Sequence, residues 1–358
     1  MIAGSVLAIV LGTMLALLLA LAAAITLAKG IRELRARRRH RIETELRPRL
    51  LDLIGGEGTT ASDFDGLSRY EGRVLESLAV QFLPKIRGEA SAAVVDLLEA
   101  RGAIEAARRR TRRMGAVGRA RAAEFLGSAR SARALPEVIR LLDDRIFEVR
   151  IVAARALGQL GDSTAIPDLL AALDAPRPLP AGPVAMSLLR LGRAGGAQQV
   201  CAGLRGRLPA TRAVAAEVVG KLGVLEAVDD VIKLLDREEV PEVRVAAARA
   251  LGEIGSARAC GPLVSCLEED LTTAVRAEAA EALGQIGVED EIRALRAALG
   301  RPDHRVQVAA ANGLVAIGSR GTAALEAEAG GERGAAAYAH RALALDALAR
   351  ADRFSRAR

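Results

Sequence analysis

The chain has 358 residues, enough for two ordinary domains or one elongated domain. Only 2% of the residues are aromatic and none is Trp, although 51% are apolar, which disfavours strand-rich folds because strands use aromatic and β-branched residues. Six of the seven excess positive charges fall in residues 29–41. The nearly neutral remainder offers little electrostatic attraction for DNA or RNA.

The first segment, residues 1–29, predicts a transmembrane anchor. Residues 2–28 carry no charged side chain, and as a helix they would extend roughly 40 Å, more than the ~30 Å hydrocarbon core of a bilayer. A cleaved signal peptide would be shorter and would begin with basic side chains, and a buried soluble helix is the other alternative. The sequence therefore favours a retained anchor.

The basic residues directly after the anchor predict its orientation. This cluster includes Arg37, Arg38 and Arg39, and Lys and Arg beside a membrane span stay on the cytoplasmic side. With four Lys against 47 Arg, the sequence fits a GC-rich bacterial genome. We expect a single-pass protein of the bacterial inner membrane, with its N-terminus outside and the rest in the cytoplasm. The same cluster is a candidate contact for anionic lipid headgroups.

The next segments lead into the main body of the chain. Residues 30–53 predict a basic juxtamembrane helix that Pro48 disturbs, and residues 54–66 predict a linker rich in Gly, Thr, Ser and Asp. Residues 67–116 predict an irregular helical entry region. Five arginines crowd its end: Arg108, Arg109, Arg110, Arg112 and Arg113. They are either a solvated face or an anion site for lipid headgroups, a phosphate or an acidic partner.

Residues 117–334 repeat at a short interval, which is the main signal in the sequence. One glycine recurs every 31 or 32 residues: Gly161, Gly192, Gly223, Gly255, Gly287 and Gly318. Periods of this length indicate stacked helical hairpins, since one hairpin cannot bury the apolar stripes of both its helices. The string at 150–161, RIVAARALGQLG, returns as RVAAARALGEIG at 244–255. Its paired Ala residues allow close helix packing, and the final Gly ends the helix.

These strings, followed by the second-helix segment TAIPDLLAAL at 164–173, resemble the HEAT-like repeats named from phycobilisome lyases. The resemblance implies an all-α fold, an α-solenoid of about seven hairpins after the transmembrane helix. It also implies a ladder of ion pairs between repeats, for which Asp144 with Arg150 and Asp270 with Arg276 are the candidates. The proline-rich residues 174–183 should break or bend the stack, and residues 335–358 should form a capping helix and tail.

Chemistry-bearing residues do not form a recognisable catalytic or metal-binding pattern. His40, His304 and His340 lack partners at metal-ligand spacing, and Cys201 and Cys260 align with apolar positions of the repeat. We expect no enzyme activity, no metal, no cofactor and no small-molecule substrate. The alternatives are a HEAT-like lyase or other enzyme, and an anionic-lipid or nucleic-acid binder acting through the Arg clusters.

The favoured function is a membrane-tethered scaffold or adaptor at the cytoplasmic face, without a specific nucleic-acid ligand. Its partner would be another protein, associated with the membrane, in a complex such as one for envelope or polysaccharide synthesis. The candidate partner face consists of basic residues on the second helices of several repeats: Arg140, Lys233, Arg293 and Arg296.

Overall fold

A computed structural model describes residues 2–113, 115–331 and 335–356. Within these residues every regular element is a helix. The chain divides into two compact units, Met1–Ala107 and Arg108–Arg358, and each is considered by itself.

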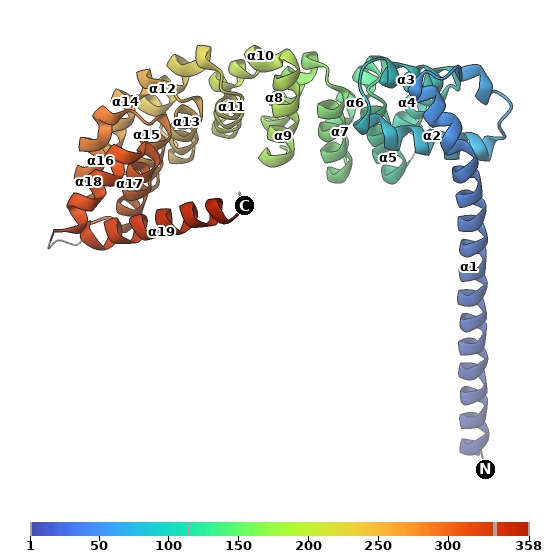
Figure 1. Ribbon diagram of the computed structural model, residues 1–358. Helices are drawn as coiled ribbons and strands as arrows, with labels where there is room; N and C mark the ends of the chain where they lie inside the picture. Colours follow the sequence, from blue (N-terminus) through green and yellow to red (C-terminus); the bar gives the residue numbers. More distant parts are fainter. Residues whose placement is uncertain (1, 114, 332–334, 357–358) are drawn as a thin grey trace. The chain divides into compact units, whose positions relative to one another are not determined.

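The first unit is built around one long helix, α1, Ile2–Gly55, which runs down the right of Figure 1. It continues through Pro48, so the predicted disturbance of the helix there is wrong. Ile42, Leu46 and Leu50 are buried one turn apart, which gives α1 an apolar stripe at helical spacing. This stripe lies in the part of α1 that packs against α2, Arg69–Phe82, and α3, Glu89–Ala100.

The predicted membrane anchor falls on the first half of α1. Most side chains of residues 1–28 lie outside the part of the molecule that the structure describes. Among the described residues, no helix has a stretch long and apolar enough to span a bilayer.

The segment after α1 is more ordered than a plain linker. It contains a 3-10 turn, η1, Ala61–Phe64, whose Phe64 is fully buried. The guanidinium of Arg101 donates a hydrogen bond of 2.8 Å to the carbonyl of Phe64, which ties the turn to the end of α3. Ser68 then caps α2 with a reciprocal pair of hydrogen bonds to Glu71.

The second unit is a row of helical hairpins. The end of α4, Ala103–Arg113, leads into it, and seven helix pairs follow among the described residues. The first helices of the pairs are α5 Ala116–Ala129, α7 Phe147–Leu160, α9 Ala181–Leu191, α11 Pro209–Leu222, α13 Pro241–Ile254, α15 Thr273–Ile286 and α17 His304–Ile317. The second helices are α6 Leu135–Arg140, α8 Ile166–Leu173, α10 Ala197–Cys201, α12 Val228–Arg237, α14 Cys260–Glu269, α16 Ile292–Leu299 and α18 Ser319–Ala329.

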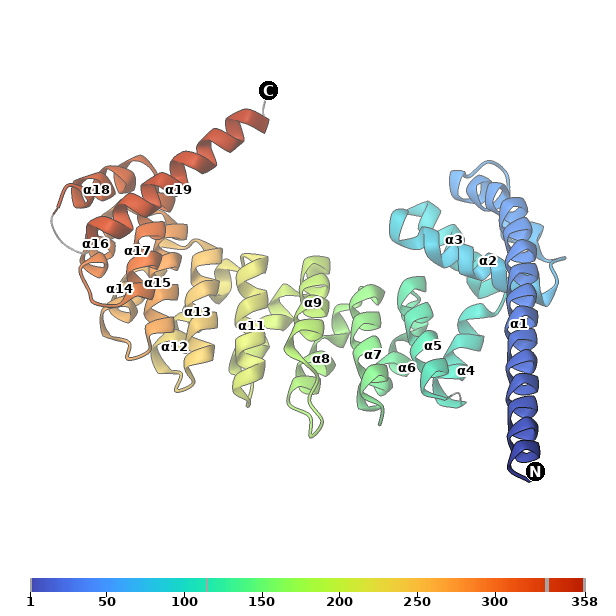
Figure 2. The same ribbon diagram turned by 90° about the horizontal axis from the view of Figure 1, so that it is seen from below.

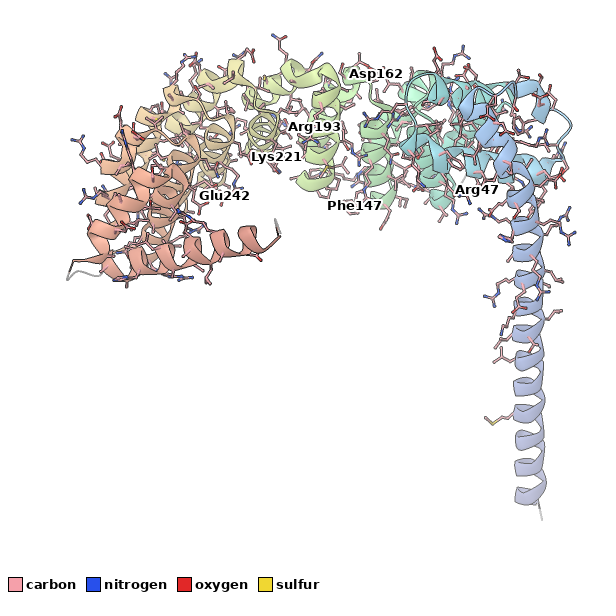
Figure 3. The ribbon with its side chains drawn as sticks, in the orientation of Figure 1. Arg47, Phe147, Asp162, Arg193, Lys221 and Glu242 are labelled. Carbon is pink, nitrogen blue, oxygen red and sulfur yellow. The ribbon has the colours of Figure 1, made fainter. Side chains whose placement is uncertain are left out.

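Figure 2 shows α7, α9, α11 and α13 side by side as one layer of this row. Figure 3 marks the two ends of α7, with Phe147 where the helix begins and Asp162 just beyond its end, at the turn into α8.

Small residues set the close spacing of the first helices. A Cβ built on Gly284 of α15 would lie 2.3 Å from the Cα of Gly313 in α17, and one on Gly252 would lie 2.8 Å from the Cα of Ala282. Larger side chains at these points would push the helices apart. The repeated "ALG" string is therefore a packing surface.

Each first helix of a typical repeat ends on a residue in the left-handed conformation. Gly161 has φ of 80° and Gly255 has φ of 74°, as the glycine period predicts. Arg130 occupies the same position after α5 with φ of 50°. It is the one described residue other than Gly with positive φ, because α5 keeps the turn but lacks the glycine.

The ion-pair ladder exists, but its pairing differs from the prediction. Arg276 donates to the backbone carbonyl of Asp270, six residues earlier, at 2.6 Å, and not to its carboxylate. The carboxylate of Asp270 instead accepts from Arg244 of the preceding repeat, at 2.7 and 3.1 Å. Arg150 likewise reaches the carbonyl of Asp144. The six-residue offset brings each Arg to the turn backbone, and the guanidinium groups of Arg244 and Arg276 also pair with Asp270 and Asp303.

The ladder is interrupted around α9. Ala181 occupies the place of the ladder arginine, and the carboxylate of Asp174 accepts from the hydroxyl of Thr211. The buried Nε of Arg150 has no hydrogen-bond partner among the described atoms. The loop at residues 174–180 precedes α9, and a π-helical turn, η6, Gly192–Gly196, follows it. The irregularity predicted at the prolines therefore extends through the whole third hairpin.

The last described helix, α19, Ala335–Arg356, packs against α17 and α18 through its first half. Ala339 and Ala342 are buried, but Leu345 and Leu348 are 53% and 67% exposed. These two leucines therefore take no part in the packing of α19 against the row. The helix instead caps the row through alanines, which allow close packing.

A candidate anion-binding groove

A basic groove lies at the start of the hairpin row, and we call it the Arg140 groove. It has a volume of about 440 Å³ and is lined by residues of α4, α5, α6 and the turn after α6. The lining residues are Thr111, Arg112, Arg119, Glu137, Arg140, Leu141, Asp144 and Arg145. All of them belong to the second unit.

Two carboxylates in the groove are held by arginines of the neighbouring helices. Glu137 has a side chain that is only 6% exposed. It accepts two hydrogen bonds from Arg108, at 3.1 and 3.0 Å, and lies 3.5 Å from Arg112. Asp144 accepts from Arg119 at 2.6 and 2.9 Å, and from the amide of Ile146 at 2.9 Å. These bidentate pairs fix the walls of the groove.

The acids stay ionised well below neutral pH. The pKa of Asp144 is lowered chiefly by the hydrogen bond from Arg119, and the charge of Arg145 contributes. For Glu137, burial raises the pKa, but the hydrogen bond and charge of Arg108, with the charge of Arg140, outweigh it, and the pKa is lowered. The charge balance of the groove is therefore fixed across the physiological range.

Positive charge remains in excess after this pairing. The lining holds four guanidinium groups against two carboxylates. Arg140 and Arg145 are exposed and have no ion-pair partner among the described side chains. An arginine fork that is accessible and not neutralised recognises carboxylate or phosphate oxygens. The groove is therefore suited to an anion.

The structure joins two predicted sets of residues that the sequence separates by almost thirty positions. Arg112, from the predicted anion cluster, and Arg140, from the predicted partner face, line the same groove. Arg108 does not line the groove but forms an ion pair with Glu137, which does. Arg109, Arg110 and Arg113 do not line it.

The remaining predicted residues are dispersed. Lys233 on α12 pairs with Asp230 at 3.0 Å, and Arg296 on α16 pairs with Glu328 at 2.6 Å. Arg293 is exposed on α16. These three residues do not join Arg140 in one site.

The predicted headgroup cluster on α1 also has internal partners. Arg39 pairs with Glu43 at 2.5 Å, and Arg38 lies over the ring of Tyr70 at 5.1 Å. Arg37 is exposed. Packing against α2 therefore occupies part of this cluster.

Sequence reasoning missed Arg119, Glu137, Asp144 and Arg145 as site residues. Arg119 could have been found, because it holds the place in its repeat that Arg244 and Arg276 hold in theirs. Arg145 carries no such signal. It becomes part of the groove only through the turn that follows α6.

Other reactive groups do not gather into a site in the described part of the chain. No group of three or more His, Cys, Asp or Glu side chains there is placed to hold a metal ion. Burial raises the pKa of Cys266 to about 12, so its thiol is protonated at neutral pH. His304 contacts the Tyr338 hydroxyl at 3.1 Å.

Several solved structures are similar to this chain. Human deoxyhypusine hydroxylase in complex with glycerol is 22% identical, with a TM-score of 0.31, over 70% of this chain and 99% of that chain. The complex of CpcE and CpcF of phycocyanin lyase from Nostoc sp. PCC7120 is 22% identical, with a TM-score of 0.29, over 66% and 91%. An engineered protein is 18% identical, with a TM-score of 0.31, over 83% and 98%.

No curated protein matches the chain in sequence. The signature of HEAT repeats, in contrast, matches residues 111–188, 197–273 and 261–335, which together are well over half of the 358 residues. The resemblance seen in the sequence is confirmed, and the chain belongs to the HEAT-repeat family.

Proposed function

We propose that the protein is a membrane-tethered scaffold that holds another protein at the cytoplasmic face of a bacterial inner membrane. It acts by binding and not by catalysis, as an accessory subunit of a membrane-associated complex. The observation that carries the proposal is the Arg140 groove, where Arg140 and Arg145 are exposed without ion-pair partners.

The repeat architecture supports a binding role. A row of hairpins presents an extended surface on which each repeat contributes a few side chains. The acids of the ladder pair with arginines of the row, as Glu238 does with Arg212 at 2.6 Å and Asp270 with Arg244 at 2.7 Å. In the Arg140 groove, Arg140 and Arg145 stay exposed beside two such pairs, and uncompensated charge favours a complementary partner.

The tether is supported by the sequence of the first segment. Residues 2–28 carry no charged side chain, and seven Lys or Arg follow within residues 29–41. Holding the scaffold at the membrane raises its effective concentration towards membrane-associated partners. Without the tether, a groove with few charged contacts would bind the same partner less completely.

Affinity purification of the full chain in mild detergent tests the scaffold function. We compare the wild type with R112Q/R140Q/R145Q, and with the control R193Q/R237Q/R293Q, which removes equal charge from exposed arginines elsewhere; Figure 3 shows Arg193. The wild type and the control should retain one co-purifying protein that the groove variant loses. Equal retention by all three, or no partner at all, would argue against the proposal.

A separate measurement tests the topology. A C-terminal fusion to a reporter that is active only in the cytoplasm should be active, and one that works only outside should be silent. The reverse pattern would place the repeats on the other side of the membrane.

A further inference from the structure

The structure points to the ligand of the Arg140 groove: we infer that it binds a doubly negative phosphate monoester on an acidic segment of a partner protein. This inference rests on the proposed scaffold function and names the chemistry of its partner. It concerns the lining residues Arg112, Arg140 and Arg145.

The charge balance of the groove selects a dianion. Glu137 and Asp144 are each neutralised by a bidentate arginine, Arg108 and Arg119 respectively. Arg112 is shared with Glu137 at the longer distance of 3.5 Å, and Arg140 and Arg145 are not ion-paired. A phosphate monoester carries about −1.5 to −2 charge at neutral pH, so it matches this excess, whereas one carboxylate leaves part of it uncompensated.

The arrangement of the donors also suits phosphate. Arg112 comes from α4, Arg140 from α6 and Arg145 from the following turn, so the forks approach the groove from separate segments. Three phosphate oxygens point in three directions and can accept from forks on different sides, whereas the two oxygens of a carboxylate lie in one plane. Leu141 and Thr111 are buried at the groove, and they supply uncharged surface between the forks.

The recess favours a protein segment over a membrane surface. Glu137 and Thr111 in the lining are 5% and 4% exposed, so the groove is recessed between its exposed arginines. A flexible acidic segment can enter it and place neighbouring carboxylates along the rim. A lipid headgroup fixed in a flat bilayer is less able to do so.

Binding of three labelled peptides to the full chain in detergent micelles tests the inference. One acidic peptide carries a single phosphoserine, the second carries Ser at that place, and the third carries Glu-Glu. We expect the phosphopeptide to bind about tenfold more tightly than the Ser peptide, the difference that one or two charge-assisted contacts make. R140Q/R145Q should lose that preference, while R237Q/R293Q should keep it.

The pH dependence adds a readout that general charge attraction would not give. The second pKa of a phosphate monoester is about 6, so the phosphopeptide should bind several-fold more weakly at pH 5 than at pH 7.5. The groove itself does not titrate in this window, because its arginines stay charged and the pKa values of Glu137 and Asp144 are lowered. The Glu-Glu peptide should bind equally at both pH values.

Several results would overturn the inference. They are equal affinity for the phosphoserine and Ser peptides, equal loss in the groove and control variants, or a phosphopeptide affinity that is the same at both pH values. Competition by inorganic phosphate or glycerophosphate at peptide concentrations would assign the groove to a free phosphate or a lipid headgroup instead. Arg140 and Arg145 are exposed, so circular dichroism should show unchanged folding in the variants.

The two proposals fail in different ways. If the groove variant loses its co-purifying partner but the phosphopeptide shows no preference, the scaffold function stands and this inference falls. If no partner co-purifies while the phosphopeptide binds as expected, the groove is an anion site and the scaffold function falls.

Discussion

Removing one ladder arginine should destabilise the hairpin row far more than removing an arginine from its outer surface. Arg244 and Asp270 have side chains only 15% and 10% exposed and share two hydrogen bonds. Arg244→Met leaves the carboxylate of Asp270 buried, with hydrogen bonds only from the backbone and side chain of Thr272 nearby. Breaking one side of such a pair costs about 3 kcal/mol in the free energy of unfolding.

The matched control is Arg258→Met. Arg258 and Asp229 form a pair of similar length, 2.6 Å, but their side chains are 67% and 57% exposed. Pairs of this kind contribute below about 1 kcal/mol. Denaturant unfolding of the full chain in detergent, followed by circular dichroism, should therefore separate the two variants by about 2 kcal/mol.

Adding Asp270→Asn to Arg244→Met tests the cause. The second substitution removes the uncompensated charge, so it should recover part of the lost stability. If Arg244→Met costs no more than Arg258→Met, or if the double variant is less stable than the single one, the ladder does not act as described.

Three further predictions concern packing, turns and pH. Gly284→Ala should lower the free energy of unfolding by about 1–3 kcal/mol, because the added Cβ would meet the backbone of α17. Gly300→Ala should cost much less, because the atom nearest to its added Cβ is 3.5 Å away. Thermal unfolding compares the two variants. Arg130→Gly should raise the free energy of unfolding by about 0.5–1 kcal/mol, because glycine adopts the left-handed conformation of this position at less cost than arginine. An unfolding midpoint that does not rise would contradict this. The hydrogen bond from Arg212 lowers the pKa of Glu238, so its stabilisation is present above the unfolded pKa near 4.5 and is lost as pH falls below it. Glu238→Gln should therefore flatten the loss of stability between pH 5 and 3, and an unchanged slope would refute the assignment.

The repeated core could be predicted from the sequence because each apolar position occurs several times. Ala153, Ala154 and Leu157 are fully buried, as their alignment with Ala247, Ala248 and Leu251 predicts. Because the same apolar stripe occurs in several repeats, an irregularity in one repeat does not obscure the pattern. The glycines predicted the helix ends at Gly161, Gly223, Gly255 and Gly287, because only glycine enters the left-handed region at low cost. Two ends differ: Arg130 takes this conformation after α5, and Gly192 after α9 is right-handed.

The ladder pairing could not be predicted from spacing alone. An offset of six residues places Arg276 close to Asp270, but it does not tell whether the guanidinium meets the backbone or the carboxylate. The offset of 26 residues that joins Arg244 to Asp270 depends on how two hairpins stack. The way in which hairpins stack depends on tertiary contacts, and the length of the repeat does not specify those contacts.

The Arg140 groove shows the same limit. Arg112 and Arg140 were both candidates, but for different roles, and their meeting depends on the packing of α4 against α6. Arg145 sits in a turn whose path no periodic pattern describes. A cluster of charges is visible in a sequence, whereas the charge that remains after internal pairing is visible only in three dimensions.

Site-specific photo-cross-linking of the full chain in living cells tests the central claim most directly. A photoreactive residue at Asp143, which is exposed beside Asp144, is compared with one at Glu269, which is exposed beside Asp270 at the matching place of another repeat. The account predicts a cross-link to one protein from position 143 that position 269 does not give, and that R140Q/R145Q abolishes. Cross-links of equal yield from both positions, or a yield at position 143 that the groove substitutions leave unchanged, would contradict it.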